Sequence, residues 1–147
     1  MSNIDDVREF LSSETGLAVV STIQRDGRVL SSVVNCGVVV HPVSGSPCVA
    51  FVSASHAARL DHIRRGSEIT VAIRRGWSWR SVTGATSLIG PDNLPSGFDS
   101  ENLRRLLREV FEAAGGTHED WEEYDRVMAE EQRVVVLVSP ERILGNY

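Results

Sequence analysis

The order of apolar and polar positions divides the chain into helical and extended segments. Near the N-terminus, apolar residues recur at the spacing of one helix face: Ile4, Val7, Phe10 and Leu11. Ser2 is the expected N-cap of this predicted helix, and Gly16 follows its end. A second, short helix is predicted within 55–66, where Gly66 gives the stop signal.

Most of the remaining chain has the composition of β-strands. β-Branched and other apolar residues dominate five ranges: 17–23, 29–40, 48–52, 69–73 and 79–89. Asp26 and Gly27, between the first two ranges, favour a hairpin turn. Gly37, inside the second range, predicts a bulge or the close approach of another backbone. The range 133–138 predicts a sixth strand, and 142–144 predicts a short edge strand.

Two amphipathic helices are predicted before the sixth strand. The first begins at Asp99 or Ser100 and ends at Gly115. Its apolar stripe consists of Leu103, Leu106, Leu107, Val110, Phe111 and Ala114. The second begins at Thr117, and its apolar face consists of Trp121, Tyr124, Val127 and Met128. Because helices and strands do not alternate regularly, the order favours one α+β, mainly β domain over 1–147, with a small antiparallel barrel and helices outside it.

Composition narrows the chemistry that such a barrel can support. All 15 basic residues are arginine, against 20 acidic residues, so the formal net charge is −5. A mildly acidic chain disfavours nucleic acid as the main partner. The absence of lysine excludes Schiff-base catalysis and a Walker-type phosphate loop. An anion would therefore be bound by arginine, hydroxyl groups or backbone N–H groups.

The residue composition also predicts the cellular location of the protein and the state of its cysteines. The acidic N-terminus lacks the apolar core of a signal peptide, and no run approaches the roughly 18 apolar residues of a membrane span. We therefore expect a cytoplasmic protein that does not contact a membrane. Cys36 and Cys48 are expected to be buried free thiols, although sequence alone leaves a disulfide open. The four histidines show no metal-ligand spacing, so no metal site is predicted.

Charge is concentrated in two segments. The range 54–80 contains six arginines against two acidic residues, whereas 99–131 contains eleven acidic residues against four arginines. The acidic segment is typical of the solvated faces of two helices. The arginines of the basic segment either bind a small anionic ligand or pair with the acidic helices, and charge alone does not decide between these alternatives.

Two groups of residues in the basic segment are candidates for a binding site. The first group consists of Ser53, Ser55, His56, Arg59 and His62. It follows the third strand and enters the short helix, where hydroxyls, N–H groups and a guanidinium suit a phosphate. A capped helix with solvent-facing polar residues is the alternative. The second group consists of Trp77, Trp79 and Arg80. Its two indoles either stack on a planar ring or fill a core or an interface.

Five segments, in order along nearly the whole chain, resemble one family. They are 20–28, 59–66, 79–85, 116–128 and 133–145. Segment 59–66 is similar to a Lys-x-x-Asn-Leu-x-Arg-Asp motif, and 79–85 to a strand that ends in Gly-x-Ala. The family is the pyridoxamine 5′-phosphate oxidase-like split β-barrel superfamily. Within it, the chain resembles the actinobacterial branch of deazaflavin-dependent reductases, which use coenzyme F420.

The resemblance implies a particular form of the barrel and a particular site. The form is an antiparallel split β-barrel of about six strands, with an N-terminal helix and a helix pair before the last strand. Two subunits would form a homodimer with the cofactor in a groove between them. Arg59 takes the place of the lysine that binds the cofactor phosphate in such proteins, and His62 replaces an asparagine. Groove-lining positions are matched by Ser31, Ser32 and Asn35. Trp77 and Trp79 are expected to reach the ring from the partner subunit.

The activity implied is that of an oxidoreductase. It would transfer a hydride between reduced coenzyme F420 and a small conjugated, enone-like organic substrate. No catalytic side chain is predicted, because the reduced cofactor itself carries the hydride while the protein binds and orients. The alternatives are an FMN-binding oxidoreductase on the same fold, or a flavin or deazaflavin carrier protein without turnover.

Overall fold

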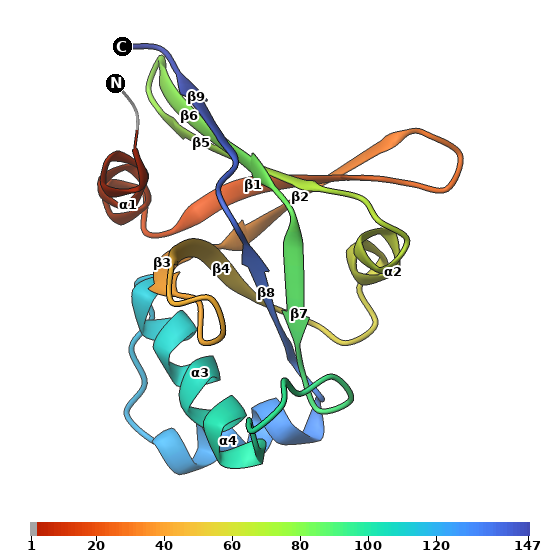
Figure 1. Ribbon diagram of the computed structural model, residues 1–147. Coiled ribbons are helices and arrows are strands. Elements are labelled where there is room, and N and C mark those ends of the chain that lie inside the picture. Colours follow the sequence, from red (N-terminus) through yellow and green to blue (C-terminus); the bar gives the residue numbers. More distant parts are fainter. Residues whose placement is uncertain (1–2) are drawn as a thin grey trace.

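Two antiparallel sheets organise the protein, whose computed structural model describes residues 3–147 (Figure 1). In that range the five-stranded sheet has the order β2 (Val29–Asn35), β1 (Leu17–Ile23), β5 (Ile69–Arg75), β6 (Ser78–Gly84) and β9 (Arg142–Gly145). The four-stranded sheet has the order β3 (Gly37–Val40), β4 (Pro47–Ser53), β8 (Val134–Val138) and β7 (Thr86–Ile89). All neighbouring strands are antiparallel. The predicted α+β, mainly β class is confirmed.

Helices lie at the outside of the two sheets. Those of the described range are α1 (Ile4–Ser13), α2 (Ala58–Arg64), α3 (Ser100–Ala113) and α4 (Trp121–Glu130). Figure 1 shows α3 and α4 together against the four-stranded sheet, whereas α1 and α2 lie on opposite sides of the region where the sheets meet. The predicted helix pair before the closing strands is thus confirmed. In the part of the chain that the structure describes, no helix is long and apolar enough to cross a bilayer.

Helix caps explain two boundaries. The side chain of Asn3 caps α1 by accepting a hydrogen bond from the N–H of Asp6. Ser2, the cap favoured by the sequence, lies outside the described residues. The predicted start of α4 at Thr117 is wrong. The side chain of Asp120 accepts a hydrogen bond from the N–H of Glu123 and thereby caps a helix that begins four residues later.

The chain passes from one sheet to the other inside two segments that the sequence predicted as single strands. The range 29–40 divides at Cys36, whose N–H donates to the carbonyl of Gly16 instead of to a strand partner. A Cβ on Gly37 would overlap the backbone of Ala113, which confirms the predicted close approach. The range 79–89 divides in the same way at Ala85. These two crossings turn a simple meander into a barrel of two sheets.

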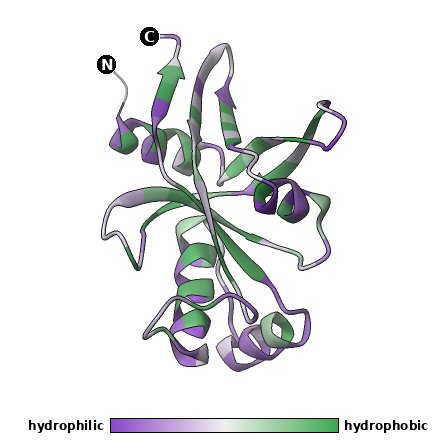
Figure 2. Ribbon diagram, turned by 45° about the vertical axis from the view of Figure 1, so that its right-hand side comes forward, coloured by the Kyte–Doolittle hydropathy of each residue, from purple (hydrophilic) through white to green (hydrophobic). Residues whose placement is uncertain are grey.

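Two apolar cores stabilise this arrangement. One lies between the sheets and includes Phe10, Phe51 and Ile69, and the other lies between the four-stranded sheet and the helix pair. Figure 2 shows mostly hydrophobic residues in the central strands, and alternating hydrophobic and hydrophilic residues along the helix pair. The predicted stripe on α3 is buried at Leu103, Leu106, Leu107 and Val110. Each such side chain contributes about 1.5–3 kcal/mol through burial.

The outer face of the five-stranded sheet carries several exposed apolar side chains within one chain. Its exposed side chains include Leu17, Val19, Ile23, Val29 and Val33. They share this face because alternate residues of β1 and β2 point to the same side and pair across the two strands. The pair Ser21 and Ser31 lies between these apolar residues on the same face. Exposed apolar side chains gathered on one face are typical of interaction sites.

Candidate functional site

Arg59, in the first turn of α2, connects the two sheets. Its Nη1 donates to Oγ of Ser53 on β4 at 3.0 Å, and its Nη2 donates to Oγ of Ser32 on β2 at 2.8 Å. The guanidinium carbon lies 5.7 Å from the ring centroid of Phe51. Since β2 and β4 belong to different sheets, the guanidinium is located where the barrel is split.

The charge of this guanidinium has no counter-ion. Arg59 is partly buried, yet no carboxylate of the described residues lies within 4.0 Å of it. Within the described range, the other arginines without such a partner are all exposed to solvent: Arg25, Arg65, Arg74, Arg75 and Arg142. Burial lowers the pKa of Arg59, but an arginine stays charged at neutral pH. Hydroxyl groups satisfy its hydrogen bonds without neutralising it, so the site can accept an anion.

The rest of α2 fixes the direction of Arg59. Leu60 and Ile63 are buried in the core between the sheets. His62, also buried, places Nδ1 at 2.8 Å from Oγ1 of Thr22 on β1. His62 therefore anchors the helix on β1 instead of joining the pair of serines at Arg59. A guanidinium held by a rigid, packed helix is preorganised for a ligand.

The three predicted groove residues of β2 lie on different faces of the strand. Ser32 points inward to Arg59. Ser31 and Asn35 lie on the outer face, where Oγ of Ser31 is 2.8 Å from Oγ of Ser21 and the Asn35 amide donates to the carbonyl of Thr15. This separation follows from the alternation of side chains along a strand. Within one chain, only Ser32 of the three contacts Arg59.

Trp79 lies on the outer face of the five-stranded sheet, opposite the face from which Ser32 reaches this cluster, and Trp77 lies beside it. Trp77, at the turn between β5 and β6, is 97% exposed, and Trp79 is 41% exposed. Both line a shallow pocket of about 590 Å³ on the outer face, together with Val19 and Val33. The tryptophans thus extend the apolar outer face and do not reach Arg59 of their own chain.

Arg80 is occupied by contacts within the chain. Its Nε forms an ion pair with the carboxylate of Asp6, and its Nη1 donates to the carbonyls of Trp79 and Asn146, both at 2.8 Å. The guanidinium carbon lies 4.2 Å from the ring centroid of Phe10 and 4.0 Å from that of Tyr147. These contacts join α1 to the end of the chain, and the structure does not bring Arg80 to Arg59.

The two cysteines are free and buried, as the sequence predicted. Burial raises the pKa of Cys36 to about 12 and that of Cys48 to about 11. Both thiols are protonated at neutral pH and are therefore poor nucleophiles. Among the described residues, no three histidine, cysteine or acidic side chains are grouped closely enough to hold a metal ion.

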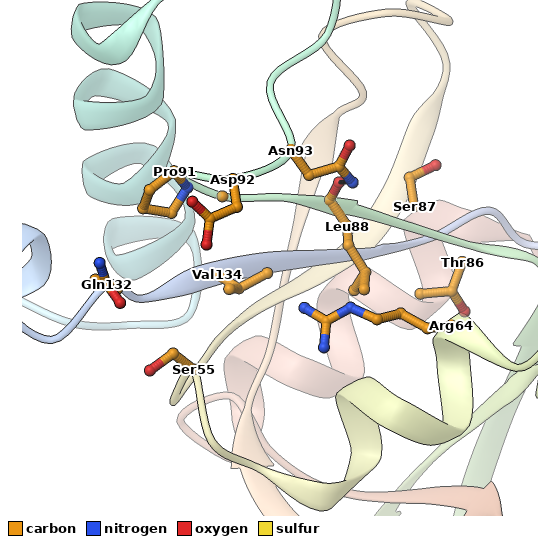
Figure 3. Close-up of a pocket in the computed structure, with 11 residues that line it drawn as sticks. Ser55, Arg64, Thr86, Ser87, Leu88, Pro91, Asp92, Asn93, Gln132 and Val134 are labelled. Carbon is orange, nitrogen blue, oxygen red and sulfur yellow. Dashed lines mark hydrogen bonds between the residues drawn. The ribbon is translucent and has the colours of Figure 1, made fainter.

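Ser55 belongs to a different cavity, which the sequence did not indicate. Its Oγ donates to the carbonyl of Glu131, and it lines a cleft together with Arg64, Thr86 and Asp92 (Figure 3). These residues are distant in sequence and meet only because β7 crosses to the four-stranded sheet. The polar turn after residue 90 was the available signal, and it predicted a connection only.

No family model matches the chain. The structure is similar to that of Rv2991, a conserved hypothetical protein from Mycobacterium tuberculosis, with a TM-score of 0.67 and 17% identity over 99% of this chain and 84% of that one. It is also similar to a pyridoxamine 5′-phosphate oxidase-related, FMN-binding protein from Nostoc punctiforme, with a TM-score of 0.62 and 13% identity over 99% and 86%.

A heme-binding protein from Mycobacterium smegmatis has a TM-score of 0.64 and 10% identity, and the match covers 99% of this chain and 55% of that one. Identities this low establish the fold and no more. The geometry of two sheets joined at a split, together with these similarities, shows that the chain has the split β-barrel fold of the pyridoxamine 5′-phosphate oxidase-like proteins.

Proposed function

We propose that the protein is an oxidoreductase that binds a phosphorylated flavin-type cofactor and transfers a hydride to or from a small conjugated, enone-like substrate. The observation that carries this proposal is the partly buried guanidinium of Arg59, which has two hydroxyl partners and no carboxylate within 4.0 Å in the described chain. A phosphate supplies the missing negative charge and can accept two parallel N–H bonds from one guanidinium.

The residues around Arg59 have separate tasks in this proposal. Arg59 binds the phosphate, while Ser32 and Ser53 orient the guanidinium and offer hydroxyls to the same anion. A reduced deazaflavin or flavin, when bound, supplies the hydride. The protein binds, orients and excludes water, and no acid or base of the chain is assigned a role.

The preferred cofactor is the deazaflavin coenzyme F420, as the resemblance of segments 59–66 and 79–85 implies. FMN is the alternative, and one observation favours it: a solved protein of the same fold from Nostoc punctiforme is described as FMN binding. A carrier without turnover has the same binding site, because cofactor binding and orientation need the same residues.

A homodimer completes the proposed site. The apolar outer face at Val19, Val33 and Trp79 is uncovered in one chain and is suited to a second copy. Sedimentation equilibrium should therefore find a dimer. Val33→Glu places a charge in that face and should give a monomer that binds the cofactor at least tenfold more weakly, whereas Val43→Glu, in an exposed loop, should leave the dimer intact.

Fluorescence titration of the protein with F420 and with FMN tests the proposal, followed by turnover of the reduced cofactor with a panel of conjugated acceptors. Micromolar or tighter binding of F420 together with turnover supports the first form. Binding of FMN alone supports the alternative, and binding without turnover supports a carrier. If neither cofactor binds, the proposed function is wrong.

A further inference from the structure

A cleft of about 930 Å³ lies between α2, β7 and the turn that follows β7 (Figure 3). Arg64 lines it from α2, Thr86 and Leu88 from β7, and Asp92 and Asn93 from the turn. Arg59 is on the same helix but contacts β2 and β4, so Arg59 and Arg64 point to two different sites. The cleft has the size of a small-molecule site and is separate from the proposed cofactor site.

Opposite charges lie on separate walls of this cleft. Arg64 has one ion pair, a loose one of 3.5 Å to Asp61. Asp92 has no hydrogen bond or ion pair to any described residue, and Arg64 and Asp92 are not paired with each other. Figure 3 shows the guanidinium and the carboxylate directed toward the same open space from α2 and from the turn. Both charges are thus available to one bound molecule.

Neutral polar groups on the walls are also incompletely bonded. Oγ1 of Thr86 is the buried side-chain atom of the described residues that has no hydrogen-bond partner. Because this oxygen is buried, it is closed to a molecule in the cleft, and recognition of a ligand depends on the charged walls. Asn93 uses its amide nitrogen on the carbonyl of Leu88, which leaves its side-chain oxygen as an acceptor. Val134 and Leu88 supply apolar surface between these groups.

We propose that this cleft binds a small zwitterion of the amino-acid class, with its carboxylate on Arg64 and its ammonium group on the side of Asp92. A simple anion would be attracted by Arg64 but repelled by Asp92. A simple cation would be attracted by Asp92 but repelled by Arg64. A molecule with both charges satisfies both walls, and its donors can reach the side-chain oxygen of Asn93. The inference is independent of the cofactor proposal, because it uses none of the residues around Arg59.

The test is an NMR titration of the ¹⁵N-labelled full chain with glycine, L-serine, L-leucine, acetate and methylammonium. At least one amino acid should give saturable shifts at residues of the cleft, and it should bind at least fivefold more tightly than acetate or methylammonium, the gain expected from adding a second charge contact of about 1 kcal/mol. Shifts outside the cleft, no saturable binding, or equal binding of acetate would overturn the proposal.

Variants locate the two ends of the ligand. Arg64→Gln and Asp92→Asn should each weaken amino-acid binding at least fivefold, and Arg64→Gln should also abolish any response to acetate. Arg65→Gln is the matched control, because Arg65 is exposed and lies outside the cleft lining. Thr86→Val keeps the shape of the side chain and removes the unpartnered hydroxyl, so its melting temperature should stay the same or rise. Amino-acid affinity that survives both charge substitutions would contradict the assignment.

Discussion

Arg59 and Arg80 are both withdrawn from solvent, both stack on aromatic rings and both use several hydrogen bonds, yet their surroundings are opposite. Arg80 meets a carboxylate, two carbonyls and two rings, which together satisfy both its charge and its donors. Arg59 meets two neutral hydroxyls and one ring. The two arginines therefore differ in charge compensation more than in burial, and this difference is the reason we propose Arg59, and not Arg80, for ligand binding.

The free-energy cost of a buried charge without a counter-ion explains why the surroundings of Arg59 and Arg80 have different consequences for stability. Breaking a buried ion pair leaves an uncompensated charge and costs about 3–5 kcal/mol of stability. A partly buried guanidinium without a counter-ion already bears part of that cost, so Arg59 contributes little to stability. Arg80 therefore stabilises the fold, and Arg59 is the arginine that we propose for the cofactor site.

The largest expected effect is a loss of stability when Arg80 is replaced. Arg80→Ala should lower the free energy of unfolding by about 3 kcal/mol, because it leaves Asp6 unpaired and removes the contact between α1 and the chain end. Urea unfolding followed by circular dichroism measures this. Arg74→Ala, at an exposed arginine of the same sheet, should change stability by less than about 0.5 kcal/mol. Equal losses of stability in Arg80→Ala and Arg74→Ala would contradict the structural role of Arg80.

The next largest effect is expected on cofactor affinity, when the serines that bind Arg59 are replaced. Ser32→Ala and Ser53→Ala each remove one hydrogen bond that orients the guanidinium. Each should weaken cofactor binding by about three- to tenfold, the scale of one hydrogen bond of about 1 kcal/mol. Isothermal titration calorimetry measures the change. Ser31→Ala, on the outer face of the same strand, is the matched control for a direct role of Ser32.

His41 extends the comparison to a buried side chain whose neutral form is favoured over its charged form. Nδ1 of His41 accepts the N–H groups of Val43 and Ser44, and burial lowers the pKa of the ring below its ordinary value of 6.5. The unfolded chain therefore binds the proton first, so this contribution to stability is complete above about pH 6.5 and is lost as the pH falls below it. Unfolding measured against pH should show this loss in the wild type.

His41→Gln removes the titrating group and should flatten that part of the profile. His56→Gln, at an exposed histidine, is the matched control. A wild-type profile that keeps its slope in the His41→Gln variant would show that other groups cause the acid sensitivity.

Local patterns predicted the parts of the fold that depend on neighbouring residues. The bounds of β1 and the buried stripe of α3 follow from alternation and helical spacing. The crossings at Cys36 and Ala85 were not predictable, because the first depends on a backbone partner at Gly16, twenty residues away, and both depend on how the sheets pack. The overall class survived because each half of a divided strand keeps its β pattern.

The candidate site shows the same limit more sharply. The sequence placed Arg59 and Arg80 in two groups of candidate binding residues, but Asp6 and Asn146, which contact Arg80 and leave it no free role, are distant from it in sequence. The family resemblance matched Ser31 and Ser32 to the same groove, although adjacent strand residues face opposite sides. The association of Arg59 with Ser53 was predictable because the two are six residues apart at a strand-to-helix junction.

The central claim is that Arg59 binds the cofactor phosphate. Calorimetric titration of the wild type, Arg59→Ala and Arg65→Ala with whichever cofactor binds, alongside urea unfolding of all three, tests it most directly. Arg59→Ala should bind at least tenfold more weakly, with stability changed by less than about 1 kcal/mol, while Arg65→Ala binds as the wild type does. Unchanged affinity in Arg59→Ala, or an equal loss in Arg65→Ala, would contradict the claim.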